Sequence, residues 1–192
     1  MEWNEYKEMS EKTLSTEFHV EKRDELLLHA VIGVLTEVEE ILDNDGEDRT
    51  NLAEEVGDIF WYLAIIGREF NMDFPEGKEY STLFKDKVGY THNMTSNHII
   101  IPIIKETCQL LDMMKKKLYY NKPIDDVKFQ SITTSIMIHI STYCKMFGLD
   151  KKSICQTNID KLRARYGDKF TSERAINRNL TKEREILEDG AK

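Results

Sequence analysis

The sequence predicts an all-α fold built around a four-helix bundle, and three observations support that prediction. The 192 residues include only 3 prolines and 9 glycines, too few for the closely spaced turns of an all-β sandwich. Hydrophobic residues make up 40% of the chain and charged residues 32%, which suits amphipathic helices with a buried stripe and a charged outer face. Apolar residues also recur at steps of three and four over several long stretches, which is the period of an α-helix.

The first two helices are bounded by turn and capping residues. The strongest apolar period runs over residues 21–43 and stops at the turn-forming residues 43–46. Thr50 or Asn51 is positioned to cap the second helix, which continues to about residue 70. A tight connection between two long helices predicts an antiparallel hairpin.

Further helices are expected over residues 99–120, 125–147, 150–166 and 172–188, with another before residue 21. Residues 73–97 are polar and contain Pro75, Gly77 and Gly89, so they predict an irregular connector. The bundle core is therefore expected to consist of two helical hairpins, with additional helices at the N- and C-terminal ends.

The two hairpins repeat one another weakly. The alignment pairs residues 35–43 with 104–112, Glu37 with Glu106, Glu40 with Gln109, and residues 69–73 with 146–150. Two such hairpins can close a four-helix bundle. A degenerate internal duplication explains the pairing, and so does the general similarity of any two amphipathic hairpins.

Charge and composition narrow the class of protein and its compartment. Lys and Arg number 27 against 35 Asp and Glu, a formal net charge of −8, which argues against a nucleic-acid-binding protein. The first twelve residues lack the apolar core of a secretory leader, and the longest apolar stretch, 99–104, is too short to span a membrane. Three cysteines without a CxxC spacing indicate a reducing compartment. We therefore expect a cytoplasmic protein without membrane or nucleic-acid partners.

Two pairs of carboxylates are the most informative feature for function. Glu37 and Glu40 are three residues apart, as are Glu55 and Asp58, so each pair is separated by about 60° around its helix and shares a face. If the two helices are antiparallel neighbours, four carboxylates can converge, and hard oxygen ligands of this number suit Mg²⁺ or Mn²⁺. The alternative is a solvated acidic face. No ExxH motif accompanies the pairs, which disfavours a ferritin-like di-iron site.

A stripe of hydrogen-bond donors follows in the expected helix 150–166. Asn158, Lys161 and Arg165 share one side of that helix and can together grip phosphate oxygens. On its own, such a stripe is more often a surface feature that pairs with neighbouring acids, here Asp160 or Asp168.

Together these patterns resemble the MazG-like all-α nucleoside triphosphate pyrophosphohydrolases. That family carries ExxE on one helix, ExxD on the next and N-x-x-K-x-x-x-R-Y downstream. In this chain the three motifs read Glu37-x-x-Glu40, Glu55-x-x-Asp58 and Asn158-x-x-Lys161-x-x-x-Arg165-Tyr166. The resemblance covers about residues 20–72 and 149–188, with residues 73–148 between them like an inserted hairpin in a single domain, 1–192.

The resemblance implies a reaction and a set of site residues. A (deoxy)nucleoside triphosphate would be hydrolysed to its monophosphate and pyrophosphate, with Mg²⁺ as cofactor, Mn²⁺ as a possible substitute, and a homodimer as the assembly. The metal ligands would be Glu37, Glu40, Glu55 and Asp58, and the triphosphate would be bound by Asn158, Lys161, Arg165 and Tyr166. Several relatives carry an acid directly before ExxE, where this chain has Thr36. Glu54 or Glu39 is the expected replacement for orienting water, unless the metal alone activates it.

Several residues and two other functions leave alternatives open. His29 can touch a base or sugar or can be a core histidine, and Trp61 and Tyr62 can stack on a base or pack in the core. Arg174 and Arg178 can cover the phosphate site or contact a second subunit. The competing functions are a non-catalytic helical interaction or dimerisation module, and the same site acting on a nucleoside diphosphate or a modified nucleotide.

Overall fold

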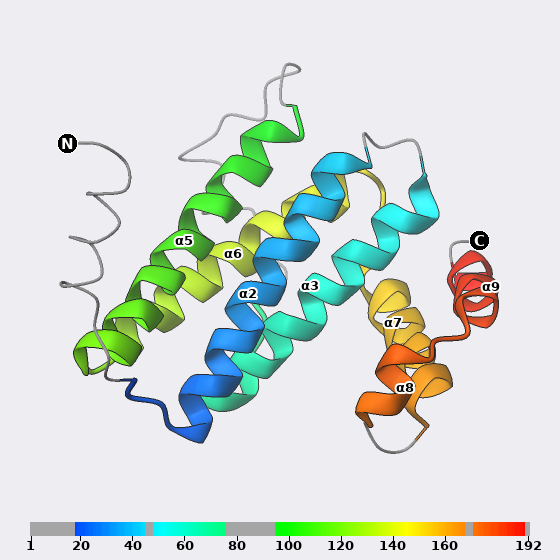
Figure 1. The fold of residues 1–192 in the computed structure, drawn as a ribbon. Coiled ribbons are helices and arrows are strands. Elements are labelled where there is room, and N and C mark those ends of the chain that lie inside the picture. Colours follow the sequence, from blue (N-terminus) through cyan, green and yellow to red (C-terminus); the bar gives the residue numbers. More distant parts are fainter. Residues whose placement is uncertain (1–17, 45–47, 76–94, 168–170, 191–192) are drawn as a thin grey trace, which may run out of the picture.

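The computed structural model describes residues 18–44, 48–75, 95–167 and 171–190 as seven helices without any strand among them (Figure 1). The all-α prediction is therefore confirmed. Within these described ranges, each helix is either too short or too polar to cross a lipid bilayer.

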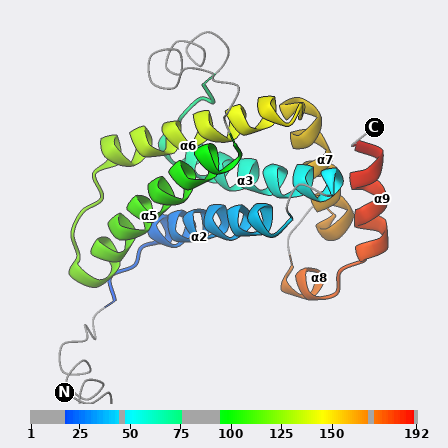
Figure 2. The same ribbon diagram turned by 90° about the horizontal axis from the view of Figure 1, so that it is seen from above.

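Four long helices form the bundle predicted from the sequence. They are α2 (Lys22–Asp43), α3 (Arg49–Phe70), α5 (Asn97–Tyr120) and α6 (Asp126–Met146). Helix α2 packs along α3, α5 packs along α6, and the two hairpins join through α2 with α5 and α3 with α6. Figures 1 and 2 show the four helices side by side from two directions.

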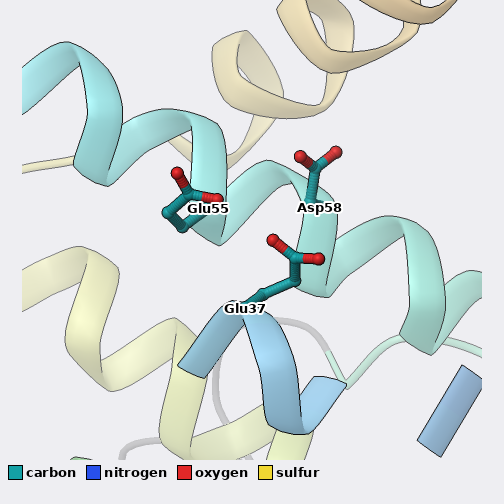
Figure 3. Close-up of side chains that lie close together, drawn as sticks. All are labelled: Glu37, Glu55 and Asp58. Carbon is teal, nitrogen blue, oxygen red and sulfur yellow. The ribbon is translucent and has the colours of Figure 1, made fainter. Parts of the chain in front are cut away.

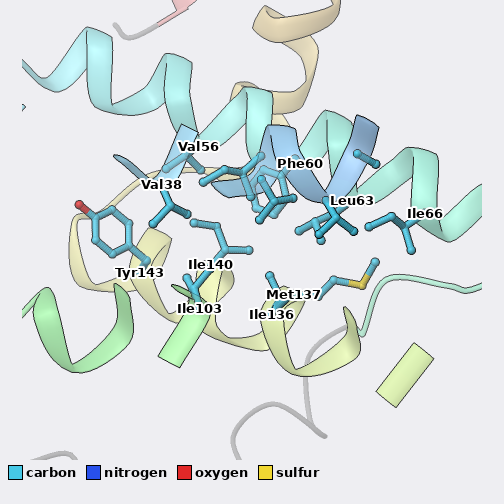
Figure 4. Close-up of a cluster of buried hydrophobic side chains, with 14 of the residues drawn as sticks. Val38, Val56, Phe60, Leu63, Ile66, Ile103, Ile136, Met137, Ile140 and Tyr143 are labelled. Carbon is cyan, nitrogen blue, oxygen red and sulfur yellow. The ribbon is translucent and has the colours of Figure 1, made fainter. Parts of the chain in front are cut away.

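The bundle is held by one apolar core to which all four helices contribute (Figure 4). Val38 of α2, Leu63 of α3, Ile103 of α5 and Ile140 of α6 are each at most 1% exposed. These residues belong to the apolar stripes that predicted the helices. Burying each such side chain, rather than leaving it in water, stabilises the fold by about 1.5–3 kcal/mol. Val38 and Val56, the chain neighbours of Glu37 and Glu55, belong to this core, so the core fixes the backbone that carries these acids.

The N-terminal cap of α3 differs from the prediction. Thr50 and Asn51 are already inside the helix, and Asp48 is the capping residue. The Asp48 carboxylate accepts hydrogen bonds from the backbone N–H groups of Thr50 at 2.9 Å and Asn51 at 3.1 Å. Asp48 performs the role because a cap side chain must stand two to three residues before the N–H groups that it satisfies.

The C-terminal part of the chain packs on the outside of the bundle. Helix α7 (Lys151–Tyr166) lies against α3, and α9 (Leu180–Gly190) packs on α7 and also touches α3, with the short α8 (Ser172–Ile176) between them (Figure 1). The prediction of one helix over 172–188 was wrong. The chain leaves the helix at Asn177, and the Asn179 side chain then caps α9 by accepting from the Lys182 N–H at 3.1 Å.

Other expectations fall partly outside the described residues. The helix predicted before residue 21 would fall mostly on residues outside the described ranges. The described residues nearest to it, 18–21, are not helical. Most of the predicted connector, 76–94, lies outside the described ranges as well, while residues 73–75 are irregular as expected.

Candidate functional site

Three carboxylates from α2 and α3 converge at the edge of the bundle. Glu37 comes from α2, Glu55 and Asp58 come from α3, and the three side chains lie close together (Figure 3). One oxygen from each lies within 4.8 Å of the other two. Glu40, the fourth predicted ligand, is exposed on α2 and lines the same cleft without belonging to this close group.

Burial makes the charge of this group costly. Burial raises the pKa of Glu37 to about 7, with Asp58 adding to the rise and a hydrogen bond from Glu55 opposing it. Burial likewise raises the pKa of Glu55 to about 9, helped by its hydrogen bond to Glu37 and by the charge of Glu40. Glu55 is only 4% exposed. The metal-free pair therefore holds a proton more tightly than an ordinary carboxyl does, because two adjacent buried carboxylates repel one another when both are ionised. A bound cation would favour the ionised form of both.

The donor set fits a hard divalent cation. Carboxylate oxygens are the ligands preferred by Mg²⁺ and Mn²⁺. Ligand oxygens stand about 2 Å from Mg²⁺, so three oxygens within 4.8 Å of one another can reach one ion through small side-chain rotations. The raised pKa values of Glu37 and Glu55 indicate a site whose negative charge lacks sufficient compensation from the protein. A cation would supply that compensation.

Helix α7 supplies a buried lysine and an asparagine that hold Asp58. The Lys161 ammonium donates to Asp58 Oδ2 at 2.6 Å and to Glu54 Oε1 at 3.0 Å, while Asn158 Nδ2 donates to Asp58 Oδ1 at 2.6 Å. Lys161 is 1% exposed and Asn158 is 4% exposed. Burial alone would lower the pKa of Lys161, but Asp58 and Glu54 outweigh it and raise that pKa above its usual value.

The close approach of α7 to α3 depends on Gly57. A Cβ at Gly57 would stand 3.2 Å from the Asn158 Cβ and from a methyl carbon of Ile154, tighter than ordinary contact. The two residues predicted to bind phosphate, Asn158 and Lys161, are consequently turned toward Asp58, where they orient a predicted metal ligand.

The third predicted phosphate-binding residue, Arg165, has a different partner. Its Nε and Nη2 donate to the two oxygens of Glu183 on α9, at 3.0 and 2.5 Å. Arg178 donates to the same carboxylate through Nε at 3.2 Å and Nη2 at 2.7 Å. Sequence reasoning did not find Glu183. In the structure Glu183 and Leu187 are the buried residues of α9. The signal available in the sequence was that Glu183 stands four residues, or about one helical turn, before Leu187.

One open cleft of about 920 Å³ is lined by the carboxylates of α2 and α3 and by both arginines, whereas Asn158, Lys161 and Glu183 lie behind its lining. Its lining includes His29, Glu37, Glu40, Glu54, Glu55, Asp58, Trp61, Tyr62, Arg165, Tyr166 and Arg178. Glu39 is exposed and does not line the cleft, so of the two residues predicted to orient water only Glu54 lies there. The cleft combines acidic, basic and aromatic walls, which suits a ligand with both an anionic chain and a flat ring.

The aromatic wall consists of three rings in edge-to-face contact. The ring centroids of His29 and Tyr62 are 5.5 Å apart, those of Trp61 and Tyr62 are 5.0 Å apart, and those of His29 and Trp61 are 6.2 Å apart. Tyr62 lies directly over Gly33 of α2, where a Cβ would stand 2.2 Å from the ring. His29 is exposed, so it is not a core histidine.

The second hairpin carries a polar cluster at the position that the repeat pairs with this site. Glu106 of α5 accepts from Ser135 Oγ at 2.6 Å and pairs with His139 Nδ1 at 3.1 Å. Both partners belong to α6. Here a single carboxylate meets neutral or basic partners, and the described residues contain one group of three or more metal-ligating side chains, which is Glu37, Glu55 and Asp58.

Comparison with known proteins adds no relative to this picture: no family model matches the chain, and no curated protein or solved structure matches it.

Proposed function

We propose that this protein is a Mg²⁺-dependent pyrophosphohydrolase that converts a (deoxy)nucleoside triphosphate to its monophosphate and pyrophosphate. The observation that supports this most strongly is the convergence of Glu37, Glu55 and Asp58 in a cleft that also presents arginines and aromatic rings. The resemblance of the three sequence motifs to the MazG-like family supports the same reaction.

Glu37, Glu55 and Asp58, joined by the nearby Glu40, would hold Mg²⁺ or Mn²⁺. When bound, such an ion neutralises phosphate charge and makes water a better nucleophile. Asn158 and Lys161 orient Asp58 through their hydrogen bonds. Because Lys161 also bonds Glu54, which lines the cleft, it would hold that carboxylate where it can accept a proton from the attacking water.

The remaining walls of the cleft would bind the substrate. Arginine guanidinium groups bind phosphate oxygens through paired N–H donors, and Arg165 and Tyr166 line the cleft. His29, Trp61 and Tyr62 present ring edges and faces on which a nucleobase can pack. By resemblance we also propose a cytoplasmic homodimer, and the net charge of −8 disfavours nucleic acid as a partner.

The burial of the carboxylates argues against a purely structural role. A non-catalytic interaction or dimerisation module would have no use for Glu55, whose 4% exposed carboxyl sits beside two further acids. Burying like charges together is destabilising, and a ligand that needs them accounts for their position. A nucleoside diphosphate or a modified nucleotide would fit the same groups and is distinguished by the products.

A nucleotide panel tests the proposal. The wild-type protein is incubated with each NTP and dNTP, and with the corresponding diphosphates, in Mg²⁺ or in EDTA, and pyrophosphate and orthophosphate are measured separately. We expect pyrophosphate release from at least one triphosphate in Mg²⁺ alone. The variant Glu55→Gln keeps the shape of the side chain but loses a ligand charge, so its kcat should fall by orders of magnitude. Absence of turnover throughout the panel, or full activity of Glu55→Gln, would overturn the proposal.

A further inference from the structure

The C-terminal segment brings a buried carboxylate between two arginines at the edge of the cleft. Glu183 of α9 is 3% exposed and accepts two hydrogen bonds from Arg165 of α7 and two from Arg178 of the α8–α9 connection. Both arginines line the same cleft as the carboxylate group of α2 and α3. Arg165, Arg178 and Glu183 therefore form one charged unit.

Counting donors and charges shows that this unit retains capacity for an anion. A guanidinium carries five N–H donors, and Glu183 takes the Nε and one Nη2 donor of each arginine. Arg165 also has a hydrogen bond with the Tyr166 side chain, so the remaining capacity lies mainly on Arg178. Two positive charges against one negative charge leave a net charge of +1. Arg178 is 38% exposed, so its other edge is open to a ligand from the cleft.

The position of Arg165 relates this unit to the proposed metal ligands. Arg165 follows Lys161 by four residues, one turn or about 6 Å along α7, and Lys161 contacts Asp58 directly. A polyphosphate chain with one end at Glu37, Glu55 and Asp58 can therefore extend along α7 toward Arg165 and Arg178.

We propose that Arg178 is a second phosphate-binding arginine, and that Glu183 is the positioning residue that holds Arg165 and Arg178 with their remaining donors toward the cleft. This inference rests on the proposed function. It makes the α8–α9 segment part of the nucleotide site, and it selects the terminal phosphates as the part of the substrate that this segment binds.

The competing explanation is that these ion pairs have only a structural role and hold α9 against α7. Leu187 of α9 is 6% exposed, and α9 packs on α7 and α3 in any case, so α9 has other anchors. An ion pair that only holds the two helices together also needs only one arginine for one carboxylate. Here two arginines share Glu183, and both line the cleft.

The test measures binding of inorganic tripolyphosphate and of a nucleoside monophosphate by calorimetry, with and without Mg²⁺. The variants are Arg178→Ala, Arg178→Lys and Glu183→Gln. Arg184→Ala is the matched control, because Arg184 lies next to Glu183 on α9, pairs with Asp48 and Glu188, and does not line the cleft. Melting temperatures are recorded for all four variants.

We expect Arg178→Ala to weaken tripolyphosphate binding about tenfold or more, the usual effect of removing a charged hydrogen bond. Its affinity for the monophosphate should change less than about threefold, because that ligand lacks the terminal phosphates. Arg178→Lys should be intermediate, since an ammonium keeps the charge but loses the fork of donors. Arg178→Ala should melt close to Arg184→Ala, because the two side chains are similarly exposed, at 38% and 42%. Glu183→Gln should weaken tripolyphosphate binding and also melt lower, because it leaves two arginines without their buried counter-charge.

Each contrary outcome has a distinct meaning. If Arg178→Ala binds tripolyphosphate as the wild type does while the wild type hydrolyses nucleotides, this inference is wrong and the proposed function stands. If the Arg178 variants lose both ligands equally and melt well below Arg184→Ala, these ion pairs only hold α9 against α7 and the inference is overturned. If the wild type binds neither ligand and hydrolyses no nucleotide, the inference and the proposed function both fail.

Discussion

Replacing the buried lysine of the site with methionine isolates the electrostatic role of that lysine. In Lys161→Met the aliphatic part of the side chain keeps its volume, but Asp58 and Glu54 lose the ammonium that donates to them at 2.6 and 3.0 Å. Lys161 is 1% exposed, so solvent cannot easily replace the lost cation. The metal-free protein should therefore be clearly less stable.

The expected loss follows from the burial of the ion pairs. Removing one partner of a buried ion pair typically costs about 3–5 kcal/mol, because the other charge stays buried without compensation. For a chain of this length each kcal/mol corresponds to about 2–4 °C in the melting temperature. The melting temperature of Lys161→Met should thus fall by roughly 10 °C.

Urea denaturation in EDTA, followed by circular dichroism, measures this loss without interference from a bound metal. The matched control is Lys115→Met, because Lys115 pairs with Asp112 at 2.7 Å but has a side chain that is 54% exposed. Solvent screens such a pair, so this control should remain close to the wild type. Equal stability of the two variants would refute the assignment of Lys161 as the buried counter-charge of the site.

Three further predictions concern the carboxylates. Millimolar Mg²⁺ should raise the melting temperature more than NaCl of equal ionic strength, because a ligand that binds only the folded state stabilises it; equal shifts would count against a metal site. In EDTA the free energy of unfolding should fall as pH rises from about 5 to 9, by up to about 1.4 kcal/mol per pH unit for each proton involved. The reason is that the folded-state pKa values of Glu37 and Glu55, about 7 and about 9, exceed the ordinary value of 4.5, so the folded protein holds protons that the unfolded chain has released. Urea titrations across that range check the slope, which should flatten in Glu55→Gln. Steady-state kinetics should show that Glu37→Gln loses kcat by orders of magnitude while Glu106→Gln stays within a few-fold of wild type; an inactive but folded Glu106→Gln would contradict a catalytically silent second hairpin.

The helical bundle could be predicted because the apolar period that specifies each helix lies within a single stretch of the chain. The apolar stripes of α2 and α3 have the helical period, and residues that share a stripe must share a buried face. The same periodicity predicted that Glu37, Glu55 and Asp58 would meet, because acids three residues apart stay on one side of each helix. Glu40 is exposed outside the close group, although its three-residue step from Glu37 is the same as that from Glu55 to Asp58. Spacing alone therefore does not say which of the four acids converge.

Contacts between segments far apart in the chain could not be predicted from the sequence. Spacing predicted that Lys161 and Arg165 lie on one side of α7, but the partner of each depends on how α7 packs. Lys161 reaches Asp58 because Gly57 lets α7 approach α3. Arg165 reaches Glu183, one of many acids in a charged tail, and the break at Asn177 that brings α9 back along α7 was not recognised either.

The proposed reaction is the hydrolysis of a triphosphate between its α- and β-phosphates by the carboxylate group with a divalent cation. Phosphorus NMR of the nucleotide that the protein hydrolyses fastest, recorded during turnover in Mg²⁺, tests this directly. We expect nucleoside monophosphate and pyrophosphate to appear in equal amounts, and both signals to be absent with Glu55→Gln. Formation of nucleoside diphosphate and orthophosphate, or the same products from Glu55→Gln at the wild-type rate, would contradict it.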